Sequence, residues 1–156
     1  MKSLIAALVV TTALTLPGMA LARPVTLTTT LNSYGGPGAY LAFYVTDAQG
    51  AYAGSLWMAG GKSKYYKHLS DWYRATAGSA AEINGITGAS VGAGRQLSIT
   101  LDLADALFDA GYVLHVDAAV EDMRDSPSEV EVPLTSTGAA EAHQGRRYIA
   151  SLVYDM

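Results

Sequence analysis

The chain has 156 residues and a formal net charge of −4; half of its residues are hydrophobic and none is cysteine. This length is that of one ordinary domain, long enough to bury a core. Without cysteine, neither a disulfide framework nor a thiolate metal site can form. The acidic balance argues against nucleic acid as a partner, because phosphate binding requires a basic surface.

The first residues have the pattern of a cleavable signal peptide. Lys2 supplies a positive charge, residues 4–16 form an apolar run broken only by threonines, and Ala20-Leu21-Ala22 gives the small-x-small pattern that signal peptidase reads. The run is shorter than the roughly 20 residues that a membrane-spanning helix needs. We therefore predict a signal peptide at residues 1–22 and a periplasmic or secreted mature chain with no membrane span.

Residues 23–156 are predicted to form a single mostly-β domain with a net charge of −5, since Lys2 is lost with the signal peptide. Apolar and polar residues alternate with the period of two that is typical of strands. A tight turn at residues 47–50 indicates a hairpin, and Pro133 suggests that its strand lies at a sheet edge. About seven short strands favour an immunoglobulin-like β-sandwich. The predicted strands are residues 25–31, 40–45, 51–58, 96–102, 112–120, 130–134 and 148–154.

Between the third and fourth predicted strands the pattern changes. Aromatic residues and leucine recur at three- and four-residue spacing over residues 64–73, which predicts one short amphipathic helix with Ser63 as its cap. Residues 75–94 are rich in glycine, serine and alanine and have no clear period. We predict a long loop there, and loops of this length inside compact domains are often functional.

The predicted loop contains the sequence Asn84-Gly85-Ile86-Thr87-Gly88-Ala89-Ser90. It resembles the recognition motif of the bacterial FMN transferase, in which an aspartate shortly precedes a Ser/Thr-Gly-Ala-Thr/Ser core and the last hydroxyl receives FMN through a phosphoester bond. The resemblance implies covalent FMN on Ser90, with Thr87, Gly88 and Ala89 as the recognised core. Asn84 stands where the motif has aspartate, and Ser90 stands where threonine is commoner.

These residue types suit the attachment of a phosphate ester. The acceptor must be a hydroxyl on an exposed, flexible segment that a second enzyme can grip. Gly85 and Gly88 let the backbone approach that enzyme closely, and successive backbone N–H groups could cradle the phosphate. The alternative interpretation is a glycine-rich surface loop that matches the motif by chance, in a chain rich in these residue types.

A wider set of segments spans nearly all of the mature chain. The segments are Tyr34-Gly35-Gly36, residues 40–47, 54–57, 64–69, Trp72-Tyr73, residues 87–90 and 111–117. Their order and spacing resemble the predicted periplasmic proteins of the domain-of-unknown-function family 2271, which has no established activity. Members resemble partners of membrane proteins with peptidase-propeptide-like domains, in settings linked to iron uptake and extracytoplasmic electron transfer. The resemblance implies a redox role, with an FMN transferase and a membrane redox or peptidase-propeptide-like protein as partners.

If FMN is attached, aromatic side chains would stack on its ring, and lysines would neutralise its phosphate or stabilise its anionic reduced form. The candidates are Trp57, Tyr65, Tyr66, Trp72 and Tyr73 for stacking, and Lys62, Lys64 and Lys67 for charge. For most of them we favour a structural interpretation. Aromatic residues at helical spacing usually pack a helix onto a sheet, and lysines usually face water.

A second cluster of polar residues follows Gly111. His115, Asp117 and Glu121 fall on one face of an extended segment, because side chains alternate with period two. Imidazole and carboxylate are plausible metal ligands, but same-face positions on one strand rarely converge on one ion. We therefore predict no metal site and interpret this face as the solvated side of an antiparallel strand.

The sequence leaves two functions open. The first is an electron-transfer carrier with FMN on Ser90 and no catalytic residues of its own. The alternative is a non-enzymatic binding module for a membrane protein, with the aromatic helix at residues 65–73, and Trp72 in particular, as its contact surface. Hydrolytic chemistry has little support, because the sequence has no nucleophile elbow, HExxH motif or P-loop.

Overall fold

The computed structural model describes residues 21–156, so the predicted signal peptide at residues 1–22 lies almost entirely outside the described residues. Eight strands form two sheets, with the strand orders β5-β1-β8 and β4-β3-β2-β6-β7. In this described part of the chain, no helix has the length and apolar character needed to cross a membrane. The strands are β1 (Ala22–Leu31), β2 (Tyr40–Thr46), β3 (Tyr52–Ala59), β4 (Thr87–Gly88), β5 (Gln96–Ala104), β6 (Val113–Ala119), β7 (Ser126–Pro133) and β8 (Ile149–Asp155).

The strand order is that of an immunoglobulin-like sandwich, as the sequence predicted. Such sandwiches place strands A-B-E-D in one sheet and G-F-C in the other, with C′ added beside C in variable domains. Here β8-β1-β5 take the places of A-B-E, and β7-β6-β2-β3 take the places of G-F-C-C′. The place of strand A is therefore filled by β8, which follows all the other strands in the chain.

The main core lies between the two sheets. Along β1 the residues Val25, Leu27, Thr29 and Leu31 point inward and are buried, while Thr26, Thr28 and Thr30 alternate with them and are only partly buried. Phe43 from β2 and Val116 from β6 meet them from the opposite sheet. The period-two alternation in the sequence thus has its expected physical cause, one buried and one less buried face on each strand.

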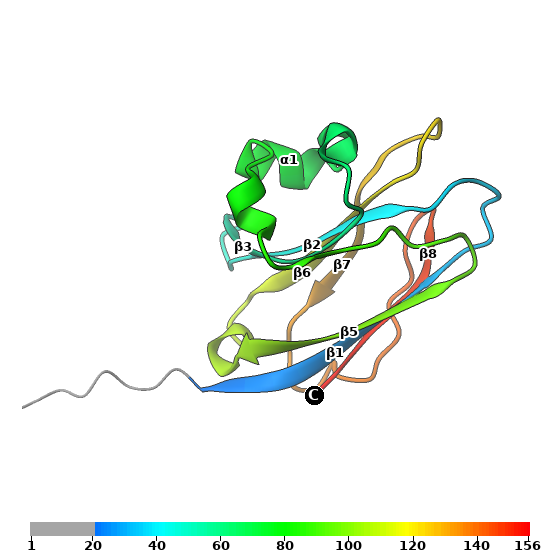
Figure 1. The fold of residues 1–156 in the computed structure, drawn as a ribbon. Coiled ribbons are helices and arrows are strands. Elements are labelled where there is room, and N and C mark those ends of the chain that lie inside the picture. The colour runs from blue at the N-terminus through cyan, green and yellow to red at the C-terminus, as the bar shows by residue number, and fades with distance from the viewer. Residues whose placement is uncertain (1–20) are drawn as a thin grey trace, which may run out of the picture.

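A helical segment covers the outer face of the five-stranded sheet (Figure 1). It comprises the 3-10 helix η1 (Ser63–His68), the α-helix α1 (Ser70–Thr76) and the 3-10 helix η2 (Ala80–Ile83). Tyr66, Leu69, Trp72 and Ile83 from this segment pack with Met58 of β3 in a second core. All residues of β2 after Tyr40 are buried, because this strand has a core on each side.

The single helix predicted over residues 64–73 is in fact two helical pieces. Leu69 separates them with non-helical backbone angles, φ −85° and ψ 69°, and its fully buried side chain enters the second core. The N-cap position of η1 is occupied by Lys62, and Ser63 is the first residue inside the helix, so the predicted cap is wrong. The structural interpretation of the aromatic pattern is confirmed, because Tyr66 and Trp72 pack the segment onto the sheet.

The long loop predicted over residues 75–94 contains more structure than expected. The end of α1, all of η2 and the two-residue strand β4 lie within it. β4 pairs with β3 in parallel, with Thr87 opposite Met58 and Gly88 opposite Ala59. Sequence periodicity cannot reveal a strand of two residues. The structure therefore has eight strands in the described residues, where the sequence predicted about seven.

The other seven strands lie where the alternating pattern predicted them, with shifts at the ends. The hairpin of β2 and β3 is confirmed, and the carboxylate of Asp47 accepts hydrogen bonds from the backbone N–H groups of Gln49 and Ala51 in its turn. The strand containing Pro133 is longer than predicted, since β7 begins at Ser126. It lies at the edge of its sheet, as the proline suggested.

A buried carboxylate fixes the start of β8. Glu129 of β7 is almost fully buried, and its Oε1 accepts backbone N–H groups from Arg147 (2.6 Å), Tyr148 (2.6 Å) and Ile149 (2.9 Å). Its other oxygen accepts a hydrogen bond from the hydroxyl of Ser126. Three backbone donors that would otherwise be unpaired are thereby satisfied, and the two sheets are joined at this point.

Candidate functional site

The motif segment, residues 84–90, is held in place by backbone hydrogen bonds on both sides of Ser90. Before it, the backbone N–H of Gly60 donates to the carbonyl of Gly88 at 2.8 Å. After it, Ala39 and Val91 exchange two backbone hydrogen bonds of 2.7 and 2.9 Å. Ala89 and Ser90 lie between these anchors and are exposed. The acceptor predicted from sequence is therefore accessible, but it sits on a tethered edge of the sheet rather than on the flexible loop that we expected.

Other motif residues have local structural roles. Thr87 donates its hydroxyl to the carbonyl of Ile83 at 2.9 Å, which ties β4 to η2. Gly85 has φ +80°, a left-handed conformation that glycine adopts without steric cost. Asn84 is exposed next to it. Asn84 and Gly85 form the turn between η2 and β4, and this turn delivers the Thr-Gly-Ala-Ser core to the sheet edge.

Packing against Trp57 accounts for glycine at position 88. A Cβ atom at this position would lie 2.8 Å from Cζ2 of the Trp57 indole. We therefore predict that Gly88→Ala lowers the free energy of unfolding by about 1–3 kcal/mol, the usual cost of overpacking. Urea denaturation followed by tryptophan fluorescence measures this loss.

The matched control is Gly54→Ala in β3, where an added Cβ meets no atom within 4 Å. This variant is expected to retain wild-type stability or to gain slightly, because alanine restricts the unfolded chain more than glycine does. Equal stability of the two variants would show that the Trp57 contact does not determine the residue at position 88.

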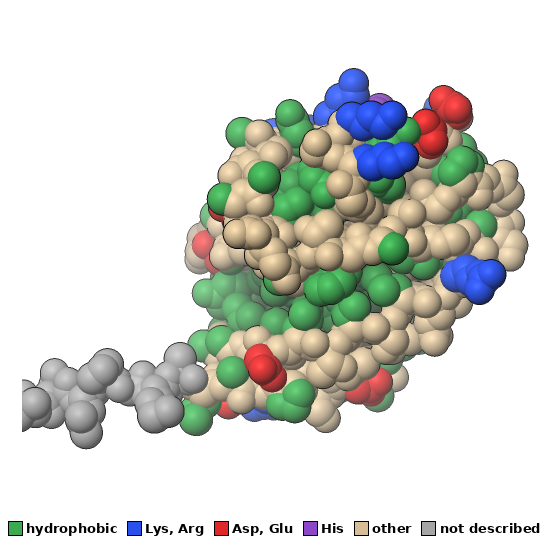
Figure 2. All heavy atoms as spheres, viewed as in Figure 1, with side chains coloured by type: hydrophobic (Ala, Val, Ile, Leu, Met, Phe, Trp, Pro, Cys, Tyr) green, Lys and Arg blue, Asp and Glu red, His purple; other side chains and the backbone are tan. Residues whose placement is uncertain are grey.

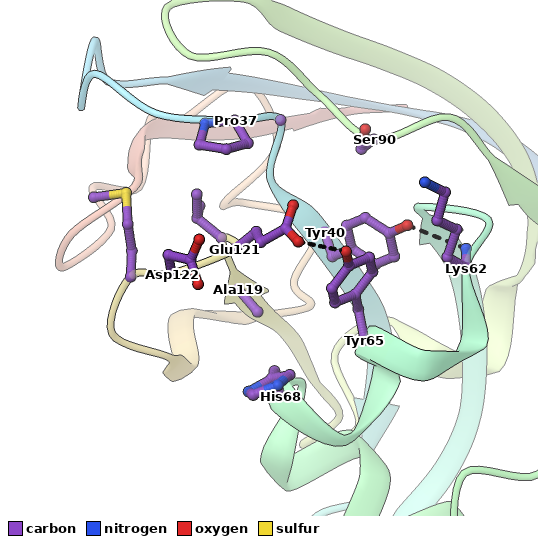
Figure 3. Close-up of a pocket in the computed structure, with 12 residues that line it drawn as sticks. Pro37, Tyr40, Lys62, Tyr65, His68, Ser90, Ala119, Glu121 and Asp122 are labelled. Atoms are coloured by element: carbon purple, nitrogen blue, oxygen red, sulfur yellow. Dashed lines mark hydrogen bonds between the residues drawn. The ribbon is translucent and has the colours of Figure 1, made fainter.

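Ser90 lies in the wall of a cavity of about 440 Å³ at one end of the sandwich. Figure 3 shows its walls, which come from the β1–β2 loop, the start of β2, η1 and the β6–β7 turn. A volume of this size falls within the range of small-molecule sites. We call it the Tyr40/Tyr65 cavity, after the two aromatic side chains that line it together with Lys62, Ser90 and Glu121.

The aromatic wall of this cavity is ordered by hydrogen bonds. The rings of Tyr40 and Tyr65 meet edge to face, with centroids 5.3 Å apart. The Tyr65 hydroxyl donates to Oε1 of Glu121 at 2.6 Å, and the Tyr40 hydroxyl accepts the backbone N–H of Lys62 at 3.1 Å. In Figure 3 the ammonium group of Lys62 extends toward Ser90. A cation thus lies on the side of the hydroxyl, and two carboxylates, Glu121 and Asp122, also line the cavity, with that of Glu121 directed at Tyr65.

A second, smaller hollow of about 320 Å³ lies on the other side of Ser90. It is lined by Trp57, by the segment from Gly88 to Gly92, by Arg95, and by Gln96 and Leu97 at the start of β5. The indole Nε1 of Trp57 is buried and has no hydrogen-bond partner. The close contact of Gly88 with the six-membered ring of Trp57 covers that part of the indole.

The structure separates the aromatic and basic candidates into different places. Tyr65 and Lys62 line the Tyr40/Tyr65 cavity, and Trp57 lines the second hollow. Tyr66 and Trp72 are buried in the second core, so neither can contact a ligand or a partner. This burial is a correction to the binding-module hypothesis, whose main contact was Trp72.

The remaining candidates lie on the surface. Tyr73 is 39% exposed, and Lys64 places its ammonium group 4.7 Å from the centre of the Tyr65 ring. Lys67 is exposed at the end of η1. Figure 2 shows that lysine and arginine side chains gather over the helical segment. Two residues of the cavity, Tyr40 and Glu121, were not recognised from the sequence in this role, because they are neighbours of Ser90 only in the folded chain.

His115 and Asp117 lie on one face of β6, as predicted, but this face is not solvated. Asp117 is fully buried beneath α1; its Oδ2 accepts the backbone N–H of Trp72 at 2.7 Å, and its Oδ1 accepts that of Ser128 at 2.8 Å. Burial, the largest influence, raises the pKa of Asp117 above 3.8. Glu121 follows the end of β6 and belongs to the cavity instead.

This buried cluster is satisfied within the protein. The His115 ring stacks on Tyr44, with centroids 5.1 Å apart, and its Nε2 lies 2.8 Å from the Thr46 hydroxyl. The Tyr44 hydroxyl donates to Asp117 at 3.1 Å, and burial raises the pKa of Tyr44 above its usual range. Within residues 21–156, no three histidine or acidic side chains are placed to hold a metal ion. The cluster joins the helical segment to the sheet.

Comparison with known proteins gives one match. The sequence profile of the family described as predicted periplasmic proteins (DUF2271) matches residues 22–151. No curated protein and no solved structure matches the chain. The match covers all strands from β1 to β7 and the first residues of β8. The segment at residues 84–90 and the cluster of His115 and Asp117 lie inside it. The chain therefore belongs to the DUF2271 family of predicted periplasmic proteins.

Proposed function

We propose that this protein is a periplasmic electron carrier with FMN joined to Ser90 Oγ by a phosphoester bond. The observation that carries the proposal is the position of the motif. Its terminal hydroxyl is exposed on a tethered sheet edge, in the wall of a cavity that also holds two tyrosines and a lysine.

The residues around Ser90 fit such a group. The hydroxyl would supply the ester oxygen: the Oγ–P bond would form as a pyrophosphate P–O bond of a flavin dinucleotide donor breaks, the nucleoside monophosphate would leave, and a base of the transferase would take the hydroxyl proton. A Cβ at Gly38 would lie 2.8 Å from Ser90 Oγ, so the absence of a side chain at this position leaves the hydroxyl uncovered on that side. Lys62 lies on the same side and would neutralise the phosphate.

A covalent link suits a carrier outside the cytoplasm, because a free cofactor would diffuse away. When bound, the flavin would accept and release electrons, and the protein would hold and shield it. The partners in this proposal are the FMN transferase that loads Ser90 and a membrane redox or peptidase-propeptide-like protein that exchanges electrons with the carrier.

Intact-mass measurement tests the proposal. Protein purified from the periplasm of its own host, or from a host with an FMN transferase, is expected to exceed the unmodified mass by one FMN less water. Ser90→Ala is expected to abolish this addition completely. The control is Ser79→Ala, which removes another exposed hydroxyl from the same stretch of chain and should retain the flavin.

Two outcomes would contradict the proposal. One is an unmodified mass for the wild-type protein from its native periplasm. The other is a flavin that stays covalently attached in Ser90→Ala, because the ester would then lie on a different residue.

A further inference from the structure

We infer that the Tyr40/Tyr65 cavity holds the isoalloxazine ring of the attached flavin, and that the second hollow, beside Trp57, does not. The inference rests on the proposed function and adds the location and orientation of the ring. Ser90 lies in the wall of both spaces, so a group linked to its hydroxyl could turn toward either. Shape, aromatic surface and charge distinguish the two.

The Tyr40/Tyr65 cavity offers the larger space and the suitable walls. Its volume of about 440 Å³ exceeds the 320 Å³ of the second hollow. Tyr40 and Tyr65 line it with aromatic surface, and Ala119 and Val120 at the end of β6 add apolar surface. Flat aromatic ligands bind well against such a combination of aromatic and aliphatic side chains.

The charged side chains of the cavity match the two ends of FMN, with a cation near the phosphate and carboxylates near the ring. The Lys62 ammonium extends toward Ser90, where the phosphate would be attached. Asp122 lies across the cavity from Lys62, and the Glu121 carboxylate lies between, bonded to Tyr65; like charge keeps the phosphate away from both. Their carboxylate oxygens can instead accept a hydrogen bond from the imide N–H of the ring. The phosphate therefore lies beside Lys62 and the ring points toward the β6–β7 turn.

The second hollow offers less aromatic surface. It has a cation, Arg95, but Trp57 is its one aromatic side chain. Gly88 packs against the six-membered ring of this indole, and the indole Nε1 is buried out of reach. A ring placed there would contact only part of the indole and would remain more exposed to water.

Flavin fluorescence in the loaded protein tests the location of the ring. A tyrosine in contact with the isoalloxazine quenches its fluorescence by electron transfer, so Tyr65→Leu is expected to raise the fluorescence per attached flavin several-fold. The control is Tyr73→Leu, an exposed tyrosine on α1 that lines neither space, and it should leave the fluorescence unchanged. Intact mass is measured first for each variant, so that only loaded protein is compared.

The reduction potential gives a second measurement, which responds to the charge beside the ring rather than to quenching. Removing a negative charge beside the ring favours the reduced, more negative flavin, so Glu121→Gln is expected to raise the potential. Glu141→Gln, an exposed glutamate between β7 and β8, is the matched control. Arg95→Gln probes the second hollow and is expected to leave the potential at its wild-type value.

The outcomes separate this inference from the proposed function. A wild-type protein without flavin overturns both. A loaded protein in which Tyr65→Leu and Glu121→Gln change neither fluorescence nor potential overturns the inference alone. A potential that shifts in Arg95→Gln and not in Glu121→Gln would place the ring in the second hollow.

Discussion

Trp72→Ala is expected to lower the free energy of unfolding by about 3–5 kcal/mol, the range measured for large aromatic side chains removed from cores. Trp72 is fully buried and meets the Tyr66 ring edge to face, with centroids 5.8 Å apart. Its indole Nε1 donates to the Ser55 hydroxyl of β3 at 2.9 Å. Alanine would leave a cavity between the helical segment and the sheet, and it would also leave the Ser55 hydroxyl without this donor.

Chemical denaturation of the purified variants measures this effect. Tyr73→Ala removes the exposed neighbouring aromatic side chain and is the matched control, with an expected change within about 0.5 kcal/mol. If Trp72→Ala were as stable as Tyr73→Ala, the helical segment would not depend on its second core. The prediction also affects binding experiments, because a partner lost on Trp72→Ala would report damage to the fold rather than a contact.

Asp117→Ala is expected to cost at least about 3 kcal/mol, since each buried donor left without an acceptor costs about 1–3 kcal/mol. The donors are the backbone N–H groups of Trp72 and Ser128 and the hydroxyl of Tyr44. Asp117→Asn keeps one acceptor oxygen and turns an amide toward another donor, so its loss is expected to be smaller. The free energies of unfolding of both variants, from urea denaturation, test the order. Equal losses for the two variants would contradict the role of the remaining oxygen.

The raised pKa of Asp117 also predicts how the free energy of unfolding changes with pH. Burial raises its pKa in the folded protein above 3.8, so the folded state binds the proton more readily than the unfolded state. Its contribution to stability therefore grows as the pH falls through the folded pKa, and the gain is complete below the unfolded value. The amide introduced by Asp117→Asn has no proton to gain over this range, so the variant lacks this contribution.

The measurement compares unfolding free energies of wild type and Asp117→Asn from neutral pH down into the acid range. Subtracting one from the other removes the contribution of every other carboxylate. The wild-type advantage over the variant is expected to increase toward low pH. A difference that stays constant or decreases would show that burial does not raise this pKa.

Strand positions could be predicted from the sequence because they depend on local alternation. β1 and β6 repeat the pattern of one apolar side chain in two, and both lie where expected. β4 and η2 could not be predicted, because Gly, Ala and Thr in this stretch carry no period and β4 exists only through its pairing with β3. Alternation placed Asp117 on the correct face of β6. Whether that face is wet depends on the helical segment that folds over it.

The candidate site likewise combines features that local sequence predicts with features that depend on distant segments of the chain. The exposed position of Ser90 was expected, since the resemblance to the FMN transferase motif implies an accessible hydroxyl. The cavity beside it is made by segments far apart in the chain, with Tyr40 from β2, Tyr65 from η1 and Glu121 from the turn after β6. Spacing in the sequence does not show that these three residues lie close together in the folded chain. Trp72 was open to two interpretations for the same reason, because helical spacing identifies a packed face but does not show what covers it.

The place of β8 in the sandwich has a consequence for the time course of folding. β1 is the central strand of its sheet, and it pairs with β8 through contacts such as Thr28 with Val153. Such distant pairings are slow to form, because closing a long loop costs entropy before the contact is gained. The neighbouring strand pairs β2–β3 and β6–β7 are expected to form early, and β1 completes its sheet only after β8 arrives. We therefore expect the sandwich to complete its fold only after β8 has been synthesised. Such a delay suits a protein that is exported to the periplasm before it folds.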